Sequence, residues 1–304
     1  PPGPRRDAIL LSAGLLLGAS VLVHPTMVLF GPFAIAWALW VRARQAGRMA
    51  AVSDATRLLL GFGFMLLLLG WFNWARFGDF LQTGRNLSPY NKMAFIPPWR
   101  SLYWYNLYRL LLGSGKGLLI VVPAAAWGAA CWRFFHRRHP SLSIALGAAV
   151  IARVLFTASY NEWHGGLCLG PRYLYPVAPF LILPVAFWVE DRLAQGKFRP
   201  LPAMAGLFAC VAQQLYFSTG EIFSFYHRLI ADHLARHVNV FQNDTLYVDW
   251  SLSPLYRLLS YRRGPWLLQA VPLDNHVLWL LLAGVALAAL VPVYRTLRPE
   301  RPLN

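Results

Sequence analysis

Long apolar runs separated by short basic segments set the pattern of this chain. The first run, residues 8–41, is almost entirely apolar, and as one helix it would be about 51 Å long. The hydrocarbon core of a bilayer is about 30 Å thick, so a single crossing does not accommodate it. His24 and Pro25 interrupt the run, and proline tends to end a helix at the preceding residue. The pattern therefore predicts a hairpin of two short membrane spans, 8–23 and 26–41.

Six further apolar runs have a length that suits a membrane-spanning helix. Together with the hairpin they predict an all-α integral membrane protein with about eight transmembrane helices. We expect residues 1–304 to form a single membrane domain, because no internal repeat or low-complexity segment divides the chain. The six later spans are 56–73, 113–132, 141–159, 173–190, 201–219 and 276–294.

The basic residues predict how these spans are oriented. Fifteen of the 28 lysines and arginines lie on the termini and short connections of one side, twelve lie on longer segments of the other side, and Arg153 lies within a span. The positive-inside rule assigns the dense short segments to the cytoplasm. We therefore expect a multi-pass protein of the inner (plasma) membrane, with both ends of this chain in the cytoplasm. The fifteen are Arg5, Arg6, Arg42, Arg44, Arg48, Arg57, Arg133, Arg137, Arg138, Arg192, Lys197, Arg199, Arg295, Arg298 and Arg301.

Three segments on the extracytoplasmic side are too long for simple turns: 74–112, 160–172 and 220–275. Loops of this length are usually functional or disordered. These contain many Trp, Tyr, Pro and Gly residues and few Ser or Glu, so we expect them to pack. Residues 221–238 have the pattern of an amphipathic helix that lies on a membrane surface.

Composition excludes an ordinary soluble protein. The chain is 57% hydrophobic and 13% charged, with a mean hydropathy of +0.44, whereas a soluble domain is about 25% charged. The net charge of +16 is explained by membrane topology, because no nucleic-acid-binding motif accompanies it. We expect no nucleic-acid partner. The three cysteines, Cys131, Cys168 and Cys210, have no metal-binding spacing, and no metal or cofactor is predicted.

The densest polar cluster runs from Tyr160 to Pro176 and joins two spans on the extracytoplasmic side. Gly165 and Gly166 in this cluster allow tight turns and close approach of a ligand. Arg172 and Tyr173 follow at the start of the next predicted helix, where a guanidinium and free N–H groups suit a phosphate or pyrophosphate. The alternative is an interfacial arginine in an aromatic belt at the end of a span.

Other residues of this cluster are candidates for acid–base chemistry or ligand binding. Glu162 is a weak candidate for a catalytic base or for a sugar or cation ligand, and the alternative is an exposed loop carboxylate. Trp163 and His164, together with Gly165 and Gly166, are candidates for substrate binding. His24 is a further candidate, because its predicted level matches this external cluster, although a lone histidine is commonly structural.

Two basic residues could extend a lipid-phosphate site. Arg153 is expected about 9 Å inside its span, where an arginine usually faces a cavity or a partner or extends its side chain towards the interface. Lys116 lies in Gly113-Ser-Gly-Lys-Gly117. This is not a nucleotide-binding phosphate loop, because residue 110 is Leu and Gly117 follows the lysine. Lys116 near a membrane surface is instead a candidate contact for a lipid phosphate.

An ordered set of short motifs resembles a known family. In chain order these are Asn73-Trp-Ala-Arg-Phe-Gly78 with Thr83-Gly84, Gly115-Lys-Gly-Leu118 with Pro123, Trp163-His-Gly-Gly166 with Gly170-Pro-Arg-Tyr-Leu174 and Pro179, and Ser253-Pro254. The set resembles the C-terminal part of bacterial polytopic glycosyltransferases of the GT-C superfamily, the kind related to protein mannosyltransferases and aminoarabinose transferases. The resemblance covers about residues 10–290.

The resemblance implies transfer of a sugar from a polyprenyl-phosphate-linked donor to a glycan, lipid or protein acceptor on the extracytoplasmic face. Arg172 matches a donor-phosphate ligand of the family. The catalytic acidic residue of the family lies in the first external loop, which this chain lacks, and we expect it upstream of Pro1. The chain begins without methionine, and we expect it to be the C-terminal part of a longer protein.

Three other functions remain open. A polymerase or ligase of lipid-linked glycans would favour paired external arginines such as Arg262 and Arg263 for a pyrophosphate leaving group. A transporter or flippase would place its site at the bilayer midplane, often on broken helices and within inverted repeats. A structural membrane partner would need no catalytic group at all.

Overall fold

The computed structural model describes residues 4–82, 95–196, 200–219, 222–237 and 245–258. Within these residues the protein is helical and contains no strand, which confirms the predicted all-α class. The chain divides into two compact units. The first comprises Pro1–Gly166 and Gly170–Trp188, and the second comprises Leu167–Leu169 and Val189–Asn304.

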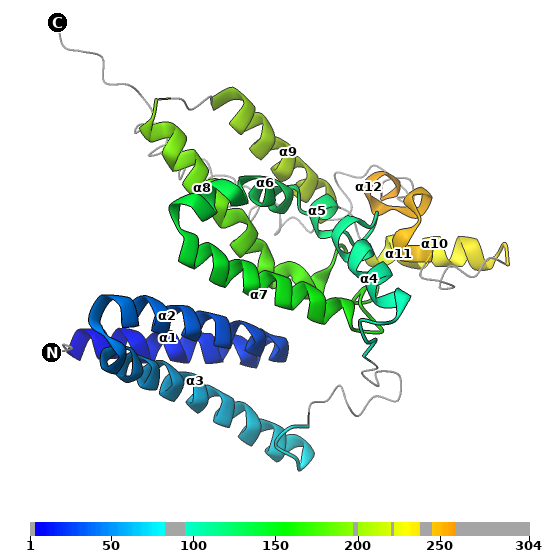
Figure 1. Ribbon diagram of the computed structural model, residues 1–304. Coiled ribbons are helices and arrows are strands. Elements are labelled where there is room, and N and C mark those ends of the chain that lie inside the picture. Colours follow the sequence, from blue (N-terminus) through cyan, green and yellow to red (C-terminus); the bar gives the residue numbers. More distant parts are fainter. Residues whose placement is uncertain (1–3, 83–94, 197–199, 220–221, 238–244, 259–304) are drawn as a thin grey trace, which may run out of the picture. The chain divides into compact units, whose positions relative to one another are not determined.

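The first unit begins with three helices that lie side by side (Figure 1). They are α1 (Pro4–Val23), α2 (Phe30–Ala46) and α3 (Arg48–Phe77), with the short 3₁₀ helix η1 (Pro25–Leu29) between the first two. Helix α1 ends directly before His24, whose backbone is extended, and Pro25 begins η1. The predicted break of the first apolar run at His24 and Pro25 is therefore confirmed.

Small residues allow α1 and α3 to approach each other closely. Gly14 and Gly18 lie one turn apart on α1; Gly61 of α3 faces Gly14, and Phe62 and Met65 of α3 face Gly18. A Cβ atom on Gly61 would lie 2.5 Å from the backbone oxygen of Leu11, and one on Gly14 would lie 2.2 Å from that of Leu58. Such small-residue contacts are typical of helix pairs in membranes.

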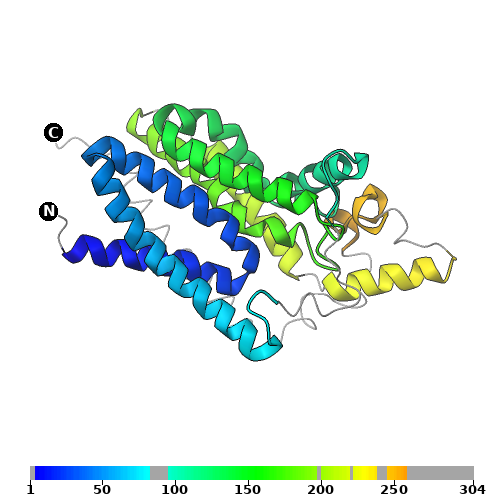
Figure 2. The ribbon, with the colours of Figure 1, turned by 60° about the horizontal axis from the view of Figure 1, so that its bottom comes forward.

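The remainder of the first unit is built around α7 (Pro140–Ala158). Helix α7 packs against α2, η1, α4 (Ser101–Leu112), α6 (Pro123–Arg138) and η3 (Arg172–Val177). The one-turn helix α5 (Leu118–Val121) precedes α6, and η3 leads directly into α8 (Ala178–Ala194). Figure 2 shows α7 (green) beside α2 (blue), which it contacts.

Five helical segments are long and apolar enough to cross a membrane: Arg6–Val23, Pro25–Ala46, Arg48–Phe77, Pro140–Ala158 and Arg172–Ala194. At most 33% of each apolar window is buried, and apolar faces of this extent are stable in lipid rather than in water. The apolar helices therefore indicate a membrane protein. They match five of the predicted spans, 8–23, 26–41, 56–73, 141–159 and 173–190.

The prediction of one continuous helix over 113–132 is wrong. Residues Gly113–Gly117 form a loop, α5 is a single turn, and α6 begins at Pro123 after a break at Val122. Proline at position 123 lacks the N–H that would continue α5 into α6. The apolar composition of the stretch was uniform, but its glycines and proline divide it.

The second unit contains α9 (Pro200–Thr219), α10 (Ile222–Leu234), α11 (Thr245–Val248), η5 (Trp250–Leu252) and α12 (Pro254–Arg257). Helix α9 confirms a helix over 201–219, and its apolar part, Ala203–Phe217, is shorter than the five segments above. Helix α10 confirms the amphipathic helix predicted within 221–238: Phe225, Tyr226 and Leu229 are buried, and His227 and Arg228 are exposed. The predicted span 276–294 lies outside the described residues.

Candidate functional site

Lys116 joins two glycine-containing loops of the first unit. One loop, Gly113–Gly117, follows α4, and the other, residues 159–166, follows α7. The Lys116 side chain is 0% exposed, and its Nζ donates a hydrogen bond of 2.7 Å to the backbone oxygen of Gly166. A buried ammonium needs such a partner to offset its lost hydration. Lys116, predicted to contact a lipid phosphate, thus holds the two loops together in this structure.

The loop after α7 turns tightly at Gly165 and Gly166, as the sequence predicts. Both have positive φ angles, +70° and +85°, which favour glycine. The Gly165 N–H donates to the backbone oxygen of Glu162 at 3.0 Å. The Gly166 N–H donates to Nδ1 of His164 at 2.9 Å. His164 therefore fixes the backbone beside the carbonyl that Lys116 binds.

Arg172 is exposed and crosses over this turn. A Cβ atom on Gly165 would lie 2.9 Å from Cγ of Arg172, so only glycine leaves room for the arginine in this position. The Arg172 guanidinium carbon lies 5.2 Å from the ring centroid of Tyr173. Arg172 begins the six-residue helix η3, and α8 begins later, at Ala178. The spanning segment Arg172–Ala194 therefore begins at Arg172, as the sequence predicts, with a 3₁₀ helix ahead of the α-helix. A phosphate contact from the N–H groups of this first turn stays a prediction.

Arg153 is buried inside the first unit, with 1% of the residue exposed. Its Nε and Nη2 atoms donate to the backbone oxygen of Tyr173 at 2.9 and 2.7 Å. The alternative in which Arg153 extends towards the interface does not describe this structure. Its two hydrogen bonds instead attach η3 to α7, and they hold the residue that follows Arg172.

The Tyr173 ring connects this region to the first hairpin. It stacks on Tyr160, with ring centroids 6.0 Å apart, and meets the His24 ring edge-on at 6.2 Å. Nδ1 of His24 lies 2.7 Å from Oγ1 of Thr26. The structure therefore brings His24 to the same cluster as Tyr173, as its predicted level implied.

Residues 95–96 lie along the start of the loop that follows α7. The N–H of Ile96 donates to the backbone oxygen of Ser159 at 2.6 Å. The Phe95 ring lies 5.3 Å from Tyr160 and 5.9 Å from Phe156. This contact continues the aromatic stack of Tyr173 and Tyr160, and the sequence analysis did not predict it.

Trp163 is 1% exposed, so its ring packs inside the unit rather than facing a ligand. Arg109 of α4 lies against it, with its guanidinium carbon 5.6 Å from the Trp163 ring centroid and 3.5 Å from that of Tyr105. Sequence analysis missed Arg109, which is 3% exposed. The helical period that places Tyr103, Asn106 and Arg109 on the inner face of α4 was the available signal.

The site therefore consists of an exposed cation, Arg172, above a tight turn that Lys116 holds through Gly166 and beside Tyr173, which Arg153 holds through its backbone oxygen. Glu162, the weak candidate for a base, is an exposed residue in the same loop. The Arg172 guanidinium lies against the Tyr173 side chain, and a planar guanidinium suits recognition of an anionic oxygen. Within the described part of the chain no group of three His, Cys, Asp or Glu side chains is placed to hold a metal ion. Arg262 and Arg263 lie outside that part.

Comparison with known proteins adds no assignment: no family model, curated protein or solved structure matches this chain.

Proposed function

We propose that this chain carries the donor-binding part of a membrane glycosyltransferase. The enzyme would transfer a sugar from a polyprenyl-phosphate-linked donor to a glycan, lipid or protein acceptor on the extracytoplasmic face. The observation that carries the proposal is Arg172, exposed above the turn at Gly165 and backed by the Tyr173 ring. The ordered motifs of the sequence, which resemble the GT-C superfamily, support the choice of substrate.

In the proposed reaction an acceptor oxygen forms a bond to the anomeric carbon of the sugar. The bond from that carbon to the donor phosphate oxygen breaks, and its electron pair leaves with the polyprenyl phosphate. The acceptor proton passes to a carboxylate, the catalytic acidic residue that the resemblance implies. Arg172 would stabilise the negative charge that develops on the leaving phosphate.

Arg153 and Lys116 have a different role in this proposal from the direct phosphate contact that the sequence predicted. Each donates to a backbone carbonyl, Arg153 to Tyr173 and Lys116 to Gly166. They are positioning residues, which hold the two backbone segments on either side of Arg172. The faces of exposed aromatic side chains in the same unit would contact the sugar and exclude water.

The test substitutes Arg172 in the full-length protein and measures transfer from a panel of polyprenyl-phosphate sugars in isolated membranes. Loss of a preorganised donor of positive charge lowers turnover by about 10²–10³-fold, so we expect this loss for Arg172→Ala. Arg172→Lys keeps the charge without the planar fork and should retain intermediate activity. Arg100→Ala, at another exposed arginine of the first unit, is the matched control. Near-normal transfer by Arg172→Ala would overturn the phosphate role.

A further inference from the structure

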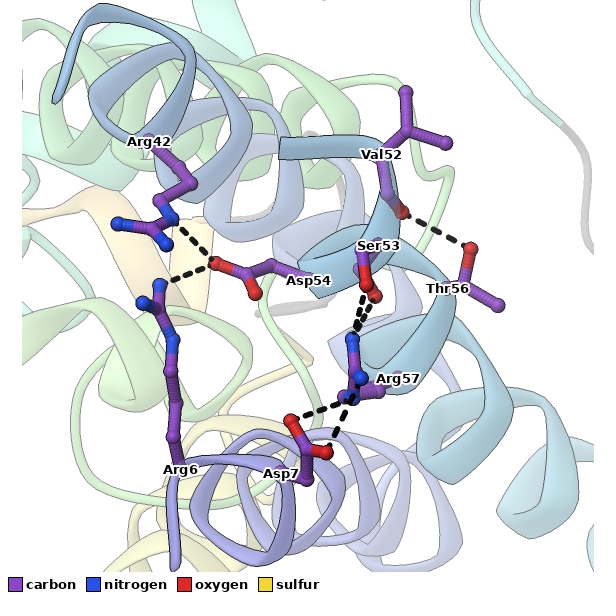
Figure 3. Close-up of polar contacts among 8 residues, drawn as sticks. All are labelled: Arg6, Asp7, Arg42, Val52, Ser53, Asp54, Thr56 and Arg57. Carbon is purple, nitrogen blue, oxygen red and sulfur yellow. Dashed lines mark hydrogen bonds and ion pairs between the residues drawn. The ribbon is translucent and has the colours of Figure 1, made fainter. Parts of the chain in front are cut away.

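A second cluster of charged residues lies where the N-terminus of α1, the C-terminus of α2 and the N-terminus of α3 meet (Figure 3). Five arginines and two aspartates gather there, which leaves an excess of three positive charges. They are Arg6, Arg42, Arg44, Arg48, Arg57, Asp7 and Asp54. The proposed transfer reaction uses none of them.

Two carboxylates bind three of these arginines. Asp54, which is buried on α3, pairs with Arg6 of α1 and, at 3.1 Å, with Arg42 of α2. Asp7 of α1 pairs with both Nε and Nη2 of Arg57, at 2.8 and 3.1 Å (Figure 3). These pairs join the three helices and neutralise two positive charges at their junction.

Arg44 and Arg48 make no ion pair within the part of the chain that the structure describes. Both are exposed. Arg44 follows Arg42 by two residues on α2, so it projects about 200° away from the side that meets Asp54. Arg48 begins α3 on the other side of the turn at Gly47. Two of the three excess positive charges of the cluster therefore lie on its outer surface.

Exposed apolar side chains adjoin these two arginines. The Arg44 guanidinium carbon lies 4.3 Å from the ring centroid of Trp40, which is 45% exposed. Met49 and Val52, at the start of α3, are 84% and 59% exposed. An arginine beside an exposed tryptophan at the end of an apolar helix matches the headgroup level of a bilayer. Charge and apolar exposure thus occur together at this corner.

We propose that the corner formed by Trp40, Arg44, Arg48 and Met49 is a binding site for an anionic phospholipid. Arg44 and Arg48 would bind the headgroup phosphate, and Trp40 and Met49 would contact the glycerol and the first part of the acyl chains. The positive charge of Arg44 and Arg48 favours an anionic over a zwitterionic lipid, because basic residues beside a membrane attract anionic headgroups. This site is separate from Arg172, and its proposal does not depend on sugar transfer.

The experiment measures lipid retention by native mass spectrometry on the purified chain in neutral detergent. Phosphatidylglycerol and phosphatidylcholine are added at matched mole fractions. Each basic residue near a membrane surface contributes about fivefold in affinity, so Arg44→Gln with Arg48→Gln should weaken phosphatidylglycerol retention by about 30-fold. Arg44→Lys with Arg48→Lys should retain most of it. Both side chains are exposed, so the fold does not depend on them.

The matched control is Arg76→Gln with Arg100→Gln, two exposed arginines outside the cluster. Arg76 lies on the last turn of α3, about 42 Å along the helix from Arg48, and it also lies over an aromatic ring, at 5.3 Å from the Phe72 centroid. This control should retain phosphatidylglycerol like the unsubstituted chain. The proposal is overturned if phosphatidylcholine binds equally, if the Arg44 and Arg48 variant retains phosphatidylglycerol, or if millimolar glycerol 3-phosphate displaces the lipid.

Discussion

Gly165 and Gly166 are neighbours with the same left-handed backbone but different surroundings. Alanine at either position costs about 1–2 kcal/mol because of its positive φ angle. A Cβ atom at Gly165 would also meet Arg172, at 2.9 Å from Cγ and 3.1 Å from Nε, whereas one at Gly166 meets no atom within 4 Å. We therefore expect both Gly165→Ala and Gly166→Ala to lower the unfolding temperature by a few degrees, but only Gly165→Ala to displace Arg172.

The measurement compares thermal unfolding with sugar transfer for the two variants. Gly165→Ala should lose transfer to nearly the extent of Arg172→Ala, and Gly166→Ala should keep most of it. Equal transfer by the two alanine variants would show that the position of Arg172 does not depend on contact with Gly165.

At the residue scale, sequence analysis identified side chains better than their partners. The local pattern predicted that Arg172 begins a helical segment and that Gly165 and Gly166 form a tight turn, and the structure has both features. The partners of Lys116 and Arg153 are backbone carbonyls 50 and 20 residues further along the chain. No local spacing specifies such a contact, because it depends on how α4, α7 and η3 pack.

At the scale of the helices, the close contact of α1 with α3 can be tested by comparing two glycines of α3. Gly61 and Gly63 both lie inside α3, where alanine is favoured over glycine by about 1 kcal/mol. A Cβ atom on Gly61 would lie 2.5 Å from the backbone oxygen of Leu11, whereas one on Gly63 meets no atom within 4 Å. Gly61→Ala should therefore lower the unfolding temperature in detergent, and Gly63→Ala should leave it unchanged or raise it. A higher unfolding temperature for Gly61→Ala would contradict this helix contact.

Apolar periodicity predicted the position of the helices well where proline or glycine lay at their ends. Helix α7 occupies Pro140–Ala158, against a predicted 141–159. The prediction of one helix over 113–132 was wrong because average hydropathy does not reflect the glycines of 113–117 or the break before Pro123. The bounds of α3 also exceed the prediction, since its first two turns contain the polar residues that form the junction with α1 and α2.

For the whole molecule, the side on which the Arg172 loop lies depends on how many segments cross before it. With the N-terminus in the cytoplasm, α1, η1–α2 and α3 bring the chain to the extracytoplasmic side after Phe77. If α5 and α6 do not cross, α7 carries the loop at residues 159–166 into the cytoplasm. If they cross as a pair, the loop lies outside. Together Leu118–Arg138 would extend about 31 Å, which is enough to cross, and the basic end of α6 favours the cytoplasm.

We therefore predict that α5 and α6 cross the membrane together. Cysteine labelling at positions 137 and 162 tests this prediction. In a chain whose three cysteines are replaced by alanine, Arg137→Cys should react with a membrane-permeant maleimide but not with an impermeant one in intact cells. Gln45→Cys and Gln195→Cys should behave in the same way, and Glu162→Cys and Asn243→Cys should react with both reagents. Labelling of Arg137→Cys by the impermeant reagent, with Glu162→Cys protected, would place Arg172 in the cytoplasm. A polyprenyl-linked donor on the extracytoplasmic face would then be out of its reach, because a bilayer core of about 30 Å would separate them.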